Sequence, residues 1–221
     1  MAERLNEQTM ALRIAREFEN GMVVNLGFGI PTLASNYIPE GREVIFQSEN
    51  GCLGYARTAI TEEEQDFNLV NAGGQFVVGN LGMCFFDHAD SFSMIRGGHI
   101  DLCVLGGLQV SEKGDLANWM IAGRQTGNIG GAMDLAFGAA KLAVVMTHTT
   151  KENEPKILKE CTYPLTAPLC VDLIVTDVAV IEVTENGLLL KETAPGWTAE
   201  EVQELTEPKL MITSDLKEMA L

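Results

Sequence analysis

The chain has 221 residues, and its 31 acidic side chains outnumber 15 basic ones to give a formal net charge of −16. A field of that sign repels polyanions, which argues against nucleic-acid binding. An apolar content of 46% is sufficient for a substantial core, and we expect a single domain over residues 1–221.

Nothing in the sequence indicates export or a membrane. The N-terminus is charged from its first residues, and the densest apolar stretch is far shorter than the roughly 20 residues that span a bilayer. Five scattered cysteines without a CxxC pair are typical of reduced thiols. We therefore expect a cytoplasmic protein.

The first predicted elements are a helix over residues 6–20 and a buried strand over residues 22–26. Apolar residues at 11, 14, 15 and 18 recur at helical spacing, and Gly21 suits the helix C-terminus. Gly27-Phe28-Gly29 follows the strand as a turn, and Pro31 fits the first turn of another helix.

A second apolar strand, over residues 44–47, runs directly into Ser48-Glu49-Asn50-Gly51. Open α/β folds build their sites at strand ends, and a carboxylate buried there can act as a nucleophile. The alternative is an exposed loop acid, which the tetrapeptide alone does not exclude. Cys52 is either a reactive thiol or, the interpretation we favour, a small buried filler.

Later segments alternate between apolar strands and helices. An acidic stretch over residues 61–66 is expected to be a solvated loop or helix face, and residues 112–115 a hairpin-type turn. The remaining elements are strands over residues 101–105, 142–147, 171–176, 178–183, 188–191 and 209–212, with helices over 132–140 and 199–205. This pattern predicts an α/β fold with an open, mostly parallel sheet covered by helices and some antiparallel edge strands.

Two glycine-rich segments are candidate ligand sites. Gly27-x-Gly29 lacks the third glycine of a dinucleotide fingerprint, so we interpret it as a tight turn that presents Asn25. The segment over residues 127–131 lacks the Lys-Ser/Thr ending of a P-loop. Its backbone N–H groups open a helix and can hold a developing oxyanion, although close helix–sheet packing explains the glycines equally well.

Other common catalytic patterns are missing from the sequence. His88, His99 and His148 have no metal-ligand spacing, and there is no G-x-S-x-G elbow, so we expect neither a metal site nor a serine hydrolase. Asp134 lies just inside the predicted helix that begins at residue 132. We favour a helix-dipole role for it over a site role.

Taken together, the segments resemble the β (B) subunit of the family I CoA-transferases, which include 3-oxoacid and butyrate–acetoacetate CoA-transferases. The resemblance covers essentially the whole chain and retains one order of motifs. The matching segments are residues 25–32 (NLGFGIPT), 48–51 (SENG), 71–74 (NAGG), 86–92 (FDHADSF), 95–102 (IRGGHIDL), 116–119 (LANW), 130–135 (GGAMDL), 164–166 (PLT) and 194–196 (APG).

The resemblance implies a CoA-transferase/NagB-like fold and a specific set of catalytic roles. Glu49 would be the nucleophile, and Asn25 with the backbone amides of Gly130 and Gly131 would stabilise oxyanions. The reaction implied is ping-pong transfer of CoA from a short-chain acyl-CoA to an acceptor acid of the acetoacetate, butyrate, acetate or succinate class. It passes through an acyl-glutamyl anhydride and a glutamyl-CoA thioester, in ketone-body or short-chain fatty-acid metabolism.

The resemblance also implies a hetero-oligomer with a homologous α subunit and no cofactor besides CoA as substrate. The charge of −16 agrees with a partner that helps to bind the phosphates of CoA. We expect substrate contacts at Gly27, Gly29, Asn50 and Gly51.

Two segments depart from the family pattern, residues 52–58 and residues 123–129, and they put the acyl-chain specificity in question. Two alternatives stay open. One is an acyl-CoA hydrolase or sugar-phosphate isomerase on a related fold, and the other is a non-catalytic binding subunit.

Overall fold

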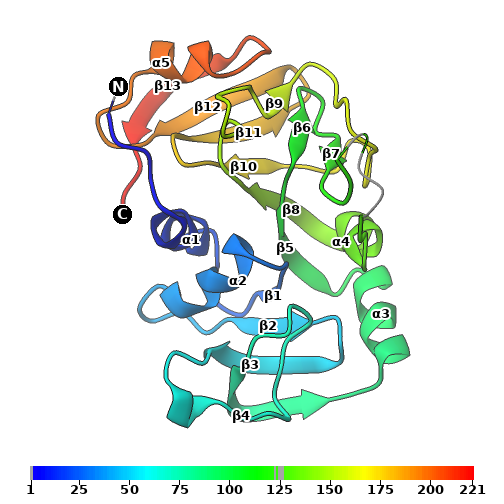
Figure 1. Cartoon of the computed structure of the whole chain (residues 1–221). Helices are drawn as coiled ribbons and strands as arrows, with labels where there is room; N and C mark the ends of the chain where they lie inside the picture. The colour runs from blue at the N-terminus through cyan, green and yellow to red at the C-terminus, as the bar shows by residue number, and fades with distance from the viewer. Residues whose placement is uncertain (1, 122, 124–126) are drawn as a thin grey trace.

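The computed structural model describes all residues except 1, 122 and 124–126. Within the described residues, ten strands form one sheet in the order β13-β12-β11-β10-β8-β5-β1-β2-β3-β4 (Figure 1). Its strands are β1 (Val23–Leu26), β2 (Ile45–Ser48), β3 (Cys52–Thr58), β4 (Val77–Phe85), β5 (Ile100–Gly106), β8 (Ala139–Val145), β10 (Leu173–Val175), β11 (Ala179–Thr184), β12 (Gly187–Thr193) and β13 (Met211–Glu218). A smaller sheet has the order β7-β6-β9, from β6 (Gln109–Ser111), β7 (Leu116–Ala117) and β9 (Ile157–Leu158).

The centre of the large sheet is parallel and its margins are mixed. Strands β10, β8, β5, β1 and β2 pair in parallel. Antiparallel pairing begins at β11 on one side and at β3 on the other. The predicted α/β fold, with a mostly parallel sheet and antiparallel strands toward its edges, is confirmed.

Helices flank the central strands on two sides. In Figure 1, α1 and α2 lie on one side, and α3 and α4 lie on the other. The α-helices are α1 (Glu7–Ala15), α2 (Ile30–Leu33), α3 (His88–Arg96), α4 (Ala132–Gly138) and α5 (Ala199–Glu204). Short 3₁₀ turns cover Ala34–Tyr37 and Glu62–Glu64. Asn6, Asp87 and Thr198 cap α1, α3 and α5 through side-chain oxygens, as polar N-cap residues commonly do.

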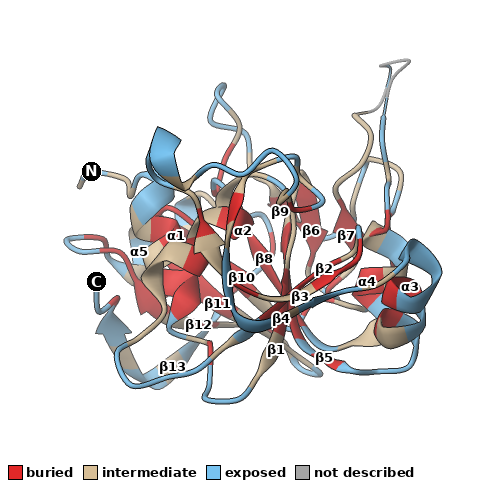
Figure 2. Cartoon of the chain, turned by 90° about the horizontal axis from the view of Figure 1, so that it is seen from below, coloured by how far each residue is buried: buried red, intermediate tan, exposed pale blue. Residues whose placement is uncertain are grey.

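The core lies between the central strands and these helices. Figure 2 shows buried residues concentrated on the central strands and the inward sides of the helices, whereas β13 is largely exposed. Residues 142–145 of β8 are all buried, as expected for a strand covered on both faces. Among the described residues, none of the helices combines the length and apolar character needed to traverse a bilayer.

The first helix is shorter than predicted, and Gly21 does not end it. Helix α1 stops at Ala15, where the backbone N–H groups of Glu17 and Phe18 bond three residues back and tighten the chain into turns. These turns bring Phe18 into the core against Phe46, with ring centroids 5.7 Å apart. Gly21 does have a left-handed φ of 83°, but in the turn that leads into β1.

Other helices and strands also end at residues different from those predicted. Helix α4 ends at Gly138 rather than residue 140, and β13 runs on to Glu218 where the sequence predicted an end at residue 212. Strands β3 and β4 were not predicted at all. Both carry glycines inside the strand, and β4 is an edge strand with most residues exposed, so neither has a clear apolar period.

The sheet topology creates a natural site at β1. The chain passes from β1 to β2, which pairs with β1 on one side, and the later strand β5 pairs with β1 on the other side. The carboxyl ends of these three parallel strands therefore meet at a topological switch point, where open α/β sheets bind ligands.

Candidate active site

Glu49 occupies the tight hairpin loop that joins β2 to β3. Ser48 pairs with Cys52 across the two strands, so only Glu49, Asn50 and Gly51 form the loop. The N–H of Gly51 donates to the carbonyl of Ser48 at 3.0 Å. Gly51 has a φ of 115°, and a Cβ there would collide with the carbonyl oxygen of Phe86. Only glycine satisfies both constraints, and it fixes where Glu49 leaves the sheet.

The carboxylate of Glu49 is half-buried and incompletely hydrogen-bonded. Its Oε2 atom is shielded from solvent and has no hydrogen-bond partner among the described residues. Burial raises the pKa of Glu49 above its ordinary value; nearby His88 opposes this rise and Asp134 adds to it. The interpretation of Glu49 as an ordinary exposed loop acid is therefore wrong, because its carboxylate is half-buried and one of its oxygens is shielded from solvent.

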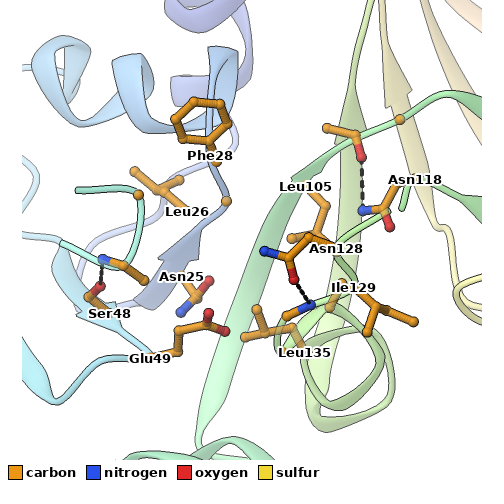
Figure 3. Close-up of a pocket in the computed structure, with 18 of the residues that line it drawn as sticks. Asn25, Leu26, Phe28, Ser48, Glu49, Leu105, Asn118, Asn128, Ile129 and Leu135 are labelled. Atoms are coloured by element: carbon orange, nitrogen blue, oxygen red, sulfur yellow. Dashed lines mark hydrogen bonds between the residues drawn. The ribbon is translucent and has the colours of Figure 1, made fainter. Parts of the chain in front are cut away.

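Glu49 faces a pocket of about 440 Å³ at the switch point (Figure 3). The pocket is lined by residues 25–28 at the end of β1 and just beyond it, Ser48 and Glu49 at the end of β2, 72–73, 105–108 at the end of β5, Asn118, 128–132 and Leu135. In Figure 3, Asn25 and Glu49 lie on one side of this space, opposite Asn128, Ile129 and Leu135. Three strand ends and the start of α4 thus converge on one carboxylate.

Asn25 reaches the pocket from inside β1. Its side chain is 3% exposed, and Nδ2 donates to Oε1 of Gln47 at 2.5 Å and to the carbonyl of Gln47 at 3.3 Å. The structure therefore brings Asn25 and Glu49 to one pocket, as the sequence predicted, and ties the amide of Asn25 to the strand that carries Glu49.

Gly130 and Gly131 also reach Glu49, and they differ from each other. The N–H of Gly130 donates to Oδ1 of Asn128 at 3.1 Å. Gly131 is the N-cap residue of α4, and a Cβ there would overlap Oε2 of Glu49 and lie 2.7 Å from Cζ of Phe92. Gly131 is therefore closely packed against Glu49 and Phe92, and the oxyanion role of its N–H stays a prediction.

The residues expected to contact substrate divide into two groups. Gly27 lines the pocket, while Gly29, Asn50 and Gly51 are outside its lining. Gly29 has a φ of 88° at the N-cap of α2, and Asn50 donates from Nδ2 to the carbonyl of Val70 at 2.8 Å. In this structure, these three residues shape the turns around the pocket.

Several lining residues were not identified as site residues from the sequence. Leu105 and Gly106 end β5, the strand adjacent to β1, and only the sheet order reveals that they face the pocket. Asn118 is held by Gly106, whose carbonyl accepts from its Nδ2 at 3.1 Å, and by Thr166. In the sequence, Asn118 was indicated by its position in the LANW segment, which is part of the family resemblance.

The remaining candidates have structural roles. Burial raises the pKa of the Cys52 thiol to about 11, which fits a buried filler rather than a reactive thiolate. Asp134 pairs with Nε of Arg96 at 2.7 Å, tying α4 to α3. Among the residues that the structure describes, no group of three or more His, Cys, Asp or Glu side chains could hold a metal ion. Of the unusual segment over residues 123–129, residues 124–126 lie outside the described residues.

A half-buried carboxylate in a pocket at the switch point of an α/β sheet, beside amide donors, defines a site suited to nucleophilic acyl transfer. Comparison with known proteins indicates the same class of reaction. The family described as coenzyme A transferase matches residues 7–205. The chain is 46% identical over 215 residues to the beta subunit of the acetate CoA-transferase of Haemophilus influenzae, covering 97% of this chain and 96% of that protein.

Two further proteins extend the likeness. The chain is 48% identical over 207 residues to the B subunit of the 3-oxoadipate CoA-transferase of Pseudomonas putida, covering 93% and 96% of the two chains. An acyl-CoA transferase from Escherichia coli O157:H7 has the same fold, with a TM-score of 0.75 and 21% identity; the match covers all of this chain but 44% of that one. The chain belongs to the coenzyme A transferase family, and the relatives that it matches along their length are named as the beta or B type of subunit.

Proposed function

We propose that this chain is the catalytic subunit of a heteromeric CoA-transferase and that Glu49 is its nucleophile. The observation that carries the proposal is the carboxylate of Glu49, desolvated at the pocket with Oε2 unpartnered among the described residues. Such an oxygen is free to attack an electrophilic carbon.

The chemistry proceeds in two half-reactions. A carboxylate oxygen of Glu49 attacks the thioester carbonyl of the donor, the C–S bond breaks, and CoA thiolate leaves behind an acyl-glutamyl anhydride. The thiolate then attacks the glutamyl carbonyl, releasing the first acid and forming a glutamyl-CoA thioester. The acceptor carboxylate reverses both steps, which yields the new acyl-CoA and free Glu49.

Each attack produces a tetrahedral oxyanion that requires hydrogen-bond donors. Asn25 and the backbone of Gly130 and Gly131 lie around the carboxylate, and one such donor is worth roughly 3–4 kcal/mol. Of the two glycines, Gly131 is the better candidate, because the N–H of Gly130 already donates to Asn128.

The acyl group is proposed to be short and to carry no second charge. Glu49 is the only charged residue among the described lining residues, and the pocket wall includes Leu26, Leu105 and Leu135. A second carboxylate in the acyl chain would be buried beside Glu49 without a cation from this wall. Acetyl, butyryl and acetoacetyl groups need no cation here, whereas a succinyl or 3-oxoadipyl group would need one from the alpha subunit.

A homologous alpha subunit is proposed to complete the site and to supply cations for the phosphates of CoA. The relatives are themselves named as beta or B subunits, which implies such a partner for those proteins. The net charge of −16 and the absence of Lys or Arg from the described pocket lining support the same division in this chain.

The test uses the chain assembled with its partner subunit. Incubation with an acyl-CoA and no acceptor, followed by peptide mass spectrometry, should yield a CoA adduct on Glu49 and none in Glu49→Ala. An adduct at another residue would overturn the assignment. Glu49→Ala should assemble normally, and full transfer activity in that variant would indicate a non-catalytic binding role.

The same preparation separates transfer from hydrolysis. A transferase shows ping-pong kinetics and releases product acid in proportion to the acceptor supplied. Steady CoA release that does not depend on an acceptor would favour a hydrolase.

A further inference from the structure

Hydrogen bonds between buried polar side chains link Asn25 on β1 to Gln47 on β2 and Gln47 to Ser91 on α3. Gln47 on β2 is 1% exposed and Ser91 on α3 is fully buried. Nε2 of Gln47 donates to Oγ of Ser91 at 2.8 Å, and Oγ of Ser91 donates to the carbonyl of Ser48 at 3.4 Å. Buried polar groups cost stability unless they are paired, so an apolar residue would be the simpler choice at Gln47.

The direction of these hydrogen bonds determines the orientation of each amide. Nε2 of Gln47 donates to Oγ of Ser91, so Oε1 of Gln47 faces Asn25 and accepts from its Nδ2. Asn25 therefore presents Nδ2 to Gln47 and turns Oδ1 toward the thiol of Cys103, 4.0 Å away.

The two hydrogen bonds from Nδ2 of Asn25 are unequal. The bond to Oε1 of Gln47 measures 2.5 Å, whereas the bond to the Gln47 carbonyl measures 3.3 Å, beyond the usual range for N–H···O. Nδ2 is therefore held mainly by Oε1 of Gln47, and its longer contact with the Gln47 carbonyl is weak enough to be exchanged for a stronger acceptor.

We propose that Gln47 is a positioning residue for the transfer reaction: its side-chain oxygen anchors one N–H of Asn25 so that the other can move to the oxyanion of the tetrahedral intermediate. This inference rests on the proposed function, because it assigns Gln47 an effect that passes through Asn25. Ser91 sets the orientation of Gln47 and so affects Asn25 through Gln47.

The test is a double-mutant cycle on the assembled enzyme, with kcat, KM and thermal unfolding measured for each variant. Asn25→Ala should lower kcat about a hundredfold or more, as expected for loss of an oxyanion donor. Gln47→Leu should lower kcat roughly ten- to a hundredfold with little change in KM. In the Asn25→Ala background, Gln47→Leu should have no further effect on kcat, because the group it positions is already gone.

Gln109→Leu is the matched control. Gln109 is another buried glutamine on a strand, hydrogen-bonded to Thr162 and outside the pocket lining. Its loss should lower the unfolding temperature while leaving kcat within about threefold of wild type. If Gln47→Leu fails to assemble, Ser91→Ala takes its place in the cycle, with a smaller loss of kcat and the same non-additivity.

The outcomes separate the two hypotheses. An unchanged kcat in Asn25→Ala would refute the oxyanion role that the proposed function gives to Asn25. A large effect of Asn25→Ala combined with a neutral or fully additive Gln47→Leu would refute the positioning role alone.

Discussion

Replacing Gly131 by alanine should displace the carboxylate of Glu49, the proposed nucleophile, without removing any hydrogen-bond donor. The added Cβ would overlap Oε2 of Glu49 and lie 3.1 Å from its Cδ and 2.7 Å from Cζ of Phe92. Gly131 does not have a left-handed φ, so alanine adds no backbone strain and keeps the N–H. The cost therefore arises from contact with Glu49 and Phe92.

The expected magnitude follows from the displacement. To restore an ordinary van der Waals distance, the carboxylate must move by more than about 1 Å, and a misplacement of about 1 Å already costs roughly a hundredfold in rate. Overpacking against Phe92 adds about 1–3 kcal/mol of destabilisation. We expect Gly131→Ala to lower kcat/KM for CoA transfer at least about a hundredfold while the enzyme still folds and assembles.

The assay is CoA transfer by the assembled enzyme, with thermal unfolding measured in parallel. Gly79→Ala is the matched control, because its Cβ would meet Sδ of Met83 at an ordinary 3.5 Å and Gly79 lies outside the pocket lining. A Gly131→Ala enzyme within threefold of wild type would show that the position of Glu49 is not determined by the space at Gly131.

Three further predictions concern pH and stability. Burial raises the pKa of Glu49, so kcat/KM should rise with pH through a midpoint above the ordinary 4.5. The native state also holds this proton more tightly than the unfolded state does. Glu49→Gln should therefore gain stability over wild type as pH rises through that midpoint. A midpoint at or below 4.5 would contradict this. Burial lowers the pKa of His148 from 6.5 to about 4, so wild type should lose roughly 3 kcal/mol as pH falls between these values, and His148→Gln should lack this loss in urea titrations. Glu192→Ala should cost roughly 1.5–3 kcal/mol, because the buried guanidinium of Arg13 loses its 2.7 Å bond to Glu192 and keeps its partner Glu17. The exposed Glu182→Ala should change stability by less than about 1 kcal/mol, and equal effects would refute the difference in burial.

The central fold was predictable because its signals are local. Buried parallel strands give continuous apolar runs, and residues 142–145 or 102–105 have no other simple interpretation. The antiparallel strands β3 and β4 were missed because glycines interrupt them and most of β4 is exposed. The shortened α1 reflects tertiary packing, since burial of Phe18 against Phe46 outweighs continuation of the helix.

The candidate site was predictable only in part. Glu49, Asn25 and Gly131 are marked by strand ends and glycines, which can be identified in the sequence. Gln47 carried no comparable signal, because one glutamine in an apolar strand does not reveal its partners. Its hydrogen bond to Asn25 depends on the register in which Asn25 of β1 lies beside Gln47 of β2, and only the folded sheet supplies that.

The geometry around Glu49 balances two requirements of a carboxylate nucleophile. The group must be ionised, yet an oxygen fully satisfied by hydrogen bonds attacks poorly. Burial raises the pKa of Glu49 and increases its basicity, while the nearby charge of His88 limits that rise. Oε2 has no hydrogen-bond partner among the described residues, so in the proposed reaction its first strong partner is the incoming acyl carbon. The anhydride and thioester proposed for Glu49 both hydrolyse, so the proposed reaction requires a second surface that excludes water from the pocket, which is the physical reason to expect catalysis only in the assembled enzyme.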